Sequence, residues 1–95
     1  MGERESVAAA IRRVPAATSA ITLSSANFHR LGFIIHNDST AILFVKFGPG
    51  ASSTDFTHRL DAQGSLEHRT GKVWRGIVTG LWDAAVGAAQ VTELL

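Results

Sequence analysis

The sequence contains no cysteine and only two prolines, and charged residues make up just 18% of its 95 positions. Without cysteine the chain forms neither disulfides nor thiolate metal sites, so a domain of this size relies on its core and on oligomerisation for stability. The formal net charge of +1 leaves no basic surface of the kind that phosphate backbones or anionic lipids select. We therefore expect neither a nucleic acid nor a membrane among its partners.

Long hydrophobic runs are also missing. No stretch approaches the ~18 apolar residues of a transmembrane helix, and the opening "MGERESVAAA" lacks the apolar segment of a secretory signal. We expect a protein that stays in the compartment where it is synthesised. Hydrophobic residues nonetheless make up 45% of the chain, which is enough for one domain with one core.

Two apolar runs, residues 31–35 and 41–47, flank a short polar stretch in "RLGFIIHNDSTAILFVKFG". Both are rich in β-branched and aromatic residues, and Gly-Pro-Gly ends the second, which is typical of strands bounded by turns. The Asn, Asp, Ser and Thr between them favour a tight turn. The pattern predicts an antiparallel hairpin. A helix from Thr40 to Phe47 with Ser39 as its cap is the disfavoured alternative, because β-branched residues form helices poorly.

Further segments with alternating polarity predict more strands, separated by turn residues roughly every 8 to 12 positions. This spacing is typical of an antiparallel sandwich or small barrel. The segments are Ala20–Leu23, Phe56–Asp61, Ser65–Arg69 and Lys72–Thr79, with a turn at residues 70–71 before the last of them.

Two alanine-rich segments, "ESVAAAIRRV" and "DAAVGAAQVTELL", fit either helices or strands, with Ser6 or Asp83 as possible helix caps. Gly87 inside the second favours a closing hairpin from Gly80–Ala85 into Ala88–Leu94, since a mid-helix glycine costs about 1 kcal/mol. Proline 15 ends the first segment, which we interpret as an extended arm. The predicted organisation is an N-terminal arm over residues 1–17 and a β-sandwich domain over residues 18–95.

Both faces of the predicted central strands are apolar, because Phe33 and Ile35 point one way and Ile34 the other, while Phe44 and Val45 are likewise neighbours on opposite faces. One face builds the core, and the other must meet a loop, an arm or another subunit. Two arginines near the N-terminus are candidates for docking an acidic neighbour, and the tryptophans suit either core or interface, with Trp82 favoured as core. The predicted interface residues are Arg12, Arg13, Ile34, Leu43, Val45 and Trp74.

Catalytic and metal-binding patterns are weak. His58 and His68 lie on neighbouring predicted strands and can come close, but no cysteine or further histidine completes a metal site. His36, Asp38 and Ser39 supply the residue types of a catalytic triad, yet they crowd at one turn with no room to align. No nucleophile elbow, P-loop or dinucleotide motif is present. We predict no enzymatic activity, no cofactor and no metal.

Several motifs together resemble a family of small virion proteins of tailed bacteriophages. Members carry an Arg-x-Gly strand start, an Asn-Asp-Ser turn, an Ala-Ser-x-x-Asp-Phe-Thr strand and a closing Gly-x-Trp…Gly-x-Ala-x-Val-Thr-Glu pattern. The likeness covers residues 18–94 and departs from the family pattern at residues 66–69. The matching residues are Arg30, Gly32, Asn37, Asp38, Ser39, Gly48, Ala51, Ser52, Asp55, Phe56, Thr57, Thr70, Gly71, Gly80, Trp82, Gly87, Ala89, Val91, Thr92 and Glu93.

The resemblance implies a compact antiparallel, jelly-roll-like β-sandwich with a structural role in the virion, made in the host bacterial cytoplasm. The leading hypothesis is a capsid decoration or cement protein that forms a homo-oligomer, expected from capsid symmetry to be a trimer, and binds the major capsid protein. A fibre-base or tail-associated adaptor is the alternative within the same class. A carbohydrate-binding module that uses Trp74 or Trp82 as a sugar platform is the alternative from a different class.

Overall fold

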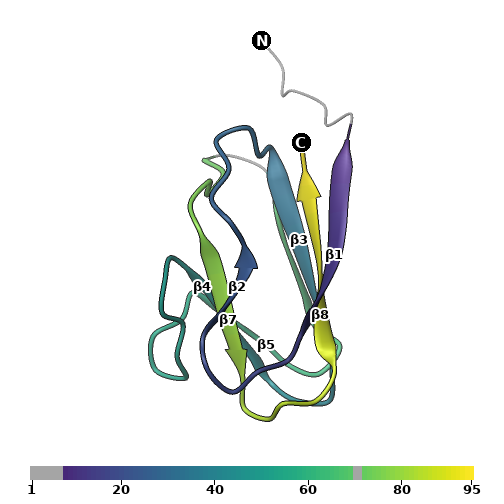
Figure 1. Cartoon of the computed structure of the whole chain (residues 1–95), viewed down its shortest axis with the longest axis vertical. Helices are drawn as coiled ribbons and strands as arrows, with labels where there is room; N and C mark the ends of the chain where they lie inside the picture. Colours follow the sequence, from purple (N-terminus) through teal and green to yellow (C-terminus); the bar gives the residue numbers. More distant parts are fainter. Residues whose placement is uncertain (1–7, 70–71) are drawn as a thin grey trace.

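The computed structural model describes residues 8–69 and 72–95, which form two four-stranded antiparallel sheets packed face to face. Figure 1 shows the two sheets as the layers of a sandwich. The expected all-β sandwich is confirmed, and the helical alternatives for residues 40–47 and 83–94 and for the described part of 5–14 are excluded. In these described ranges the chain has no helix long and apolar enough to cross a membrane.

Each strand pairs with its counterpart from the opposite end of the chain. Sheet A has the order β1-β8-β3-β6 and sheet B the order β2-β7-β4-β5. Thus β1 pairs with β8, β2 with β7, β3 with β6 and β4 with β5, as in a long hairpin wrapped across two sheets, which is a jelly roll. The strands are β1 (Ala9–Pro15), β2 (Ile21–Ser24), β3 (Gly32–Asp38), β4 (Leu43–Phe47), β5 (His58–Leu60), β6 (Ser65–His68), β7 (Val78–Trp82) and β8 (Ala88–Leu94).

Both strands of the predicted hairpin at residues 31–47 are present, but they do not pair with each other. β3 lies in sheet A and β4 in sheet B, so residues 39–42 arch across the sandwich. The side chain of Asn37 is buried in this arch, where its amide nitrogen donates to the carbonyl oxygens of Ala41, Leu60 and Asp61. Buried carbonyl oxygens need hydrogen-bond donors, and Asn37 supplies them here. The polar stretch therefore satisfies backbone groups in the interior and does not form an exposed turn.

The closing hairpin is wrong in the same way, since β7 belongs to sheet B and β8 to sheet A. Gly87 makes this second arch possible. Its φ is 75°, and a Cβ there would lie 2.5 Å from the carbonyl oxygen of Asp38, so only glycine fits. The predicted strand at Lys72–Thr79 is also wrong over residues 72–77, which form a loop before β7. The expected turn at residues 70–71 lies outside the described residues.

Part of the expected N-terminal arm is a strand of the sandwich. β1 pairs with β8 along its full length, from Ala9 opposite Leu94 to Pro15 opposite Ala88. It forms one edge of sheet A, beside the C-terminal strand (Figure 1). Residues 1–7, including Ser6, lie outside the described part of the chain.

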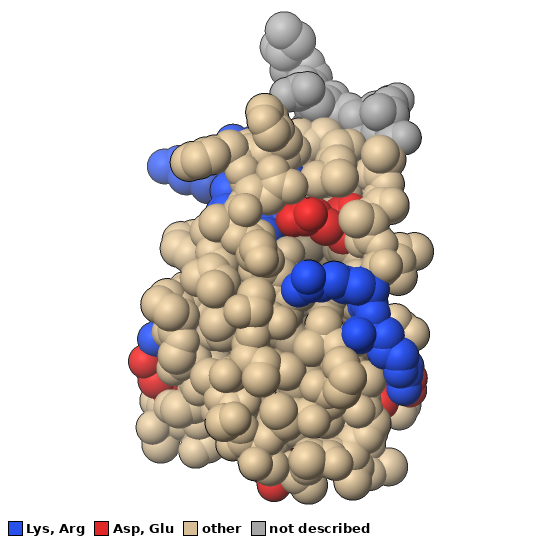
Figure 2. All heavy atoms as spheres, in the orientation of Figure 1, with Lys and Arg blue, Asp and Glu red and all other residues tan. Residues whose placement is uncertain are grey.

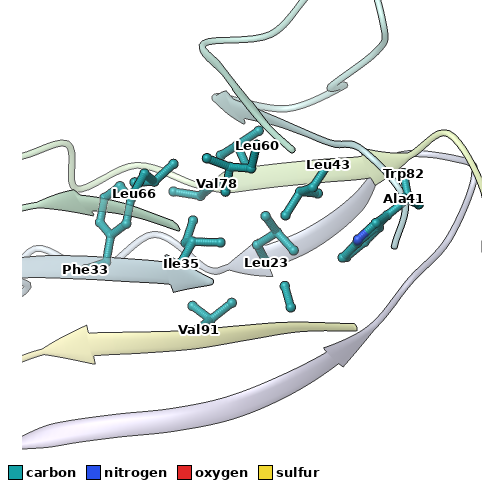
Figure 3. Close-up of a cluster of buried hydrophobic side chains, with 12 residues drawn as sticks. Leu23, Phe33, Ile35, Ala41, Leu43, Leu60, Leu66, Val78, Trp82 and Val91 are labelled. Atoms are coloured by element: carbon teal, nitrogen blue, oxygen red, sulfur yellow. The ribbon is translucent and has the colours of Figure 1, made fainter. Parts of the chain in front are cut away.

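The core lies between the sheets and extends along most of the sandwich (Figure 3). Alternate residues of each strand point inward, for example Phe33 and Ile35 on β3 and Leu43 and Val45 on β4, all of which are fully buried. Trp82 fills one end and is wholly buried, as predicted. The buried cluster consists of Leu23, Phe33, Ile35, Ala41, Leu43, Val45, Leu60, Leu66, Val78, Trp82, Ala89 and Val91.

Candidate interaction surface

Leu43 and Val45 were predicted to contact a partner, and that prediction is wrong because both are inward residues of β4. The outward residue between them, Phe44, is also covered. Phe56, from the loop after β4, lies on it with ring centroids 5.1 Å apart, and Phe44 is only 9% exposed. The apolar outer surface at this part of sheet B is therefore covered by a loop of the same chain.

Ile34, in contrast, lies on the outer face of sheet A. The strand register places it opposite Thr92, and Thr92 opposite Ile11 of β1. Leu94 is two residues further along β8 and shares this face, because successive strand residues alternate. Ile11 is 70% exposed, whereas Ile34 and Leu94 are half-buried. We call Ile11, Ile34 and Leu94 the apolar stripe; it is the candidate interaction surface.

The two arginines of β1 point to opposite faces of sheet A. Arg13 faces outward and pairs with Asp38, with 2.7 Å between Nη1 and Oδ2. The hydrogen bond from Arg13 holds the pKa of Asp38 below its ordinary value. Arg12 faces inward, and its Nε and Nη2 atoms donate to the carbonyl oxygen of Leu23 in sheet B. Arg12, which was predicted to dock an acidic neighbour, thus ties β1 to the opposite sheet.

A cleft of about 220 Å³ opens between the sheets at the β1–β2 edge. Figure 2 shows acidic atoms and a basic side chain beside a hollow on this face of the molecule. Arg12 contributes the basic group and Glu93 of β8 the acidic group. The remaining lining residues are small, polar or aliphatic: Ala10, Ser24, Ser25, Ala26, Asn27 and Val91.

Arg30 is completely buried and contacts three of the residues that line this cleft, Glu93, Ser24 and Ser25. Its Nε donates to Glu93 at 2.8 Å, and its Nη1 donates to the carbonyl oxygens of Trp74 and Gly76 at 2.9 and 3.0 Å. Nη2 donates to Ser24 and to the carbonyl oxygen of Ser25. Arg30 therefore fastens β8, the β2–β3 loop and the loop before β7 together. In the sequence Arg30 stands out only through the resemblance, because an arginine in a loop carries no signal of burial.

An aromatic cluster lies at the other open edge of the sandwich, between β5 and β6. Trp74 is 37% exposed and stacks on Phe47, with centroids 6.2 Å apart. The ring centroids of His58 and His68 lie 5.5 and 5.1 Å from that of Phe47, so both histidines contact the same phenyl ring. His68 Nε2 accepts a hydrogen bond from the backbone N–H of Trp74 at 3.0 Å. Trp74, one of the predicted interface residues, is partly packed on Phe47 and partly exposed.

Burial lowers the pKa of His68, and the nearby charges of His58 and Arg30 lower it further. The ring therefore favours the neutral form that accepts the hydrogen bond from Trp74. Across residues 8–69 and 72–95 no three His, Cys, Asp or Glu groups gather closely enough to hold a metal ion.

The three residues with triad chemistry point in different directions. His36 Nδ1 lies 2.6 Å from the hydroxyl of Ser65, and Asp38 pairs with Arg13. The hydroxyl of Ser39 is buried and donates to the side-chain oxygen of Asn37. These contacts do not align a nucleophile with a base.

No family model, curated protein or solved structure matches the chain. A proposal of function therefore rests on the geometry above and on the motifs that resemble those of virion proteins.

Proposed function

We propose that this protein is a non-enzymatic structural protein of a tailed-bacteriophage virion, a capsid decoration or cement protein that binds neighbouring capsid subunits as a homo-oligomer. The observation that carries the proposal is the apolar stripe, formed by Ile11, Ile34 and Leu94 on the outer face of sheet A. Contiguous apolar surface beside polar residues is typical of protein–protein contacts. The motifs that resemble those of phage virion proteins favour a phage particle as the binding partner.

Sheet B is a poorer candidate for the contact. Its outer residue Phe44 is already covered by Phe56, and Lys46 is paired with Asp55 at 2.6 Å. The outer face of sheet A carries the stripe with the Arg13–Asp38 ion pair at one side, so it offers an apolar centre with a polar rim, as interfaces do. We therefore assign the contact with the particle to sheet A.

The test is binding to purified phage heads and purified tails that lack this protein, measured by co-sedimentation. Ile34→Glu places a charge in the stripe, and we expect it to lower head binding at least about tenfold, the equivalent of ~1.4 kcal/mol. Thr22→Glu is the matched control, because Thr22 is exposed on sheet B, and its binding should stay within about twofold of the unmodified chain.

Three outcomes of this experiment decide between the candidates. Binding to heads that the Ile34 variant loses supports the decoration role. Binding to tails instead would favour the fibre-base or tail-adaptor alternative. Equal binding by the Ile34 and Thr22 variants, or no binding to either particle, would contradict the proposal.

A carbohydrate-binding role is the second candidate, and one observation favours it. Trp74 exposes more than a third of its surface while it stacks on Phe47, and a supported indole ring is a common sugar platform. Trp82 is wholly buried and is excluded as a platform. A titration with host-surface glycans should change the emission of the unmodified chain and of a Trp82→Phe variant if Trp74 binds sugar. Unchanged emission in both would reject this candidate.

A further inference from the structure

We infer that β1 is a self-association edge, through which the strand pairs antiparallel with β1 of a second copy about a two-fold axis at Ile11. The inference rests on the proposed assembly role of sheet A and identifies its first partner as another copy of this chain. It joins the two A sheets into one continuous sheet across the dimer.

The four sheet edges differ in their capacity to accept another strand. β5 has three residues and β6 has four. β2 has four, with a shift of register between Thr22 and Ser24. Short or irregular strands are how proteins protect a sheet edge from pairing. β1 alone is seven residues long, and its register with β8 is unbroken.

The backbone of β1 presents unpaired groups along its outer edge. The N–H of Leu95 donates to the carbonyl oxygen of Ala8, and the N–H of Ala16 donates to that of Gly87. Even-numbered residues of β1 therefore point their backbone groups at β8, and Ala9, Ile11 and Arg13 point theirs away from it. Within the described residues no hydrogen bond reaches the backbone groups of these three positions.

The length of β1 and its charges together select one register for the pairing, because an axis at Ala9 or Ala10 would leave Arg13 opposite residues that precede β1. A two-fold axis at Ile11 sets the two Ile11 residues opposite each other, Arg13 opposite Ala9 and Arg12 opposite Ala10, so no like charges meet. An axis at Arg12 or Arg13 would set two guanidinium groups directly opposite, which is destabilising. The Ile11 register also pairs the outward-facing backbone groups of Ala9, Ile11 and Arg13 with one another.

The pairing also brings the apolar stripes of the two copies together on one face. Ile11 of the first copy lies on the same outer face as Ile11 of the second, and each is followed across its own sheet by Thr92 and Ile34. Ile11, 70% exposed in the single chain, becomes the centre of the contact. A strand-edge contact is smaller than the ~1,600 Å² of a standard interface, so we expect weak association that many copies on one particle reinforce.

The test is to place a charge at residue 11, on the two-fold axis, in the full chain. Dimerisation is measured by sedimentation at protein concentrations up to ~1 mM, the weak end of specific binding. We expect the unmodified chain to dimerise with rising concentration. Ile11→Lys and Ile11→Glu, each alone, should weaken dimerisation at least about tenfold, because each puts two like charges at the axis. An equimolar mixture of the two variants should restore it, since only self-pairing at residue 11 brings opposite charges together.

A crosslink checks the register. Because the chain has no cysteine, Ile11→Cys introduces one thiol whose Cα should lie ~5.5 Å from its copy, within reach of a disulfide. Phe28→Cys is the matched control, since Phe28 is 88% exposed in a loop outside the contact. We expect air oxidation to dimerise the Ile11 variant at least about tenfold faster.

The inference is overturned if the unmodified chain stays monomeric throughout the concentration range, if the mixture associates no better than either variant, or if the two cysteine variants crosslink equally fast. Head binding is measured separately. A monomer that still binds heads would refute the self-pairing and leave the decoration role intact, whereas a dimer that binds no particle would support the self-pairing and refute the decoration role.

Discussion

Replacing the buried Arg30 by methionine should destabilise the fold more than any surface change. Methionine fills much of the same space but leaves Glu93 without its 2.8 Å ion pair and the carbonyl oxygens of Trp74 and Gly76 without their donor. The Glu93 side chain is only 17% exposed, so water cannot fully replace the guanidinium. Removing one partner of a buried pair costs about 3–5 kcal/mol, a large part of the ~5–15 kcal/mol of a typical domain.

The assay is urea denaturation, with the emission of the buried Trp82 as the probe of unfolding. Arg13→Met is the control, because the Arg13–Asp38 pair is about half exposed and such pairs contribute ~0.2–1 kcal/mol. Adding Glu93→Gln to the Arg30 variant should recover part of the loss, since the orphaned charge is then removed. A loss below ~1 kcal/mol for Arg30→Met, or one equal to that of the control, would refute this account of Arg30.

Three further predictions concern the core, the second arch and pH. Leu43→Ala should lower the free energy of unfolding by about 2–5 kcal/mol in urea denaturation and Ile34→Ala by clearly less; equal losses would contradict their assignment to core and surface. Gly87→Ala should cost about 1–3 kcal/mol, because φ is 75° there, and an unchanged melting temperature would refute the close contact. The folded-state pKa of His68 is lowered, so the unfolded chain binds the proton more readily, and stability should fall as pH drops below ~6.5 toward the folded pKa. His68→Gln should flatten this dependence and His29→Gln should not; a slope that survives the His68 change would contradict it.

The strands were predictable from the sequence and the sheets to which they belong were not. Alternation and turn residues located β3, β4, β6 and β8 to within a few residues, because a half-buried strand leaves a period-two pattern. The sequence "NDST" looks the same in a hairpin and in an arch. What decides between them is that Asn37 finds three carbonyl oxygens, two of them on or next to β5, more than twenty positions away.

The same limit applies to the interaction surface. Ile34 was correctly placed on an outer face, but Leu43 and Val45 were not, because adjacent apolar residues do not show which of two faces is covered. Phe56 covers Phe44 from a loop that sequence periodicity does not describe. The exposure of β1 as an edge was likewise invisible, since it depends on pairing with β8 at the far end of the chain.

The two arginines of β1 link the stability of the sandwich to its proposed assembly. Edge strands are commonly protected by charges that repel a second strand, and "IRRV" looks like such protection. Arg12 instead reaches inward to the carbonyl oxygen of Leu23, and Arg13 pairs with Asp38 on the outer face. Both charges are therefore held to the sides of β1 by partners in the same chain. The edge between them keeps an uncharged backbone and the exposed Ile11, so the contacts that fix β1 in the fold also leave it open to another strand.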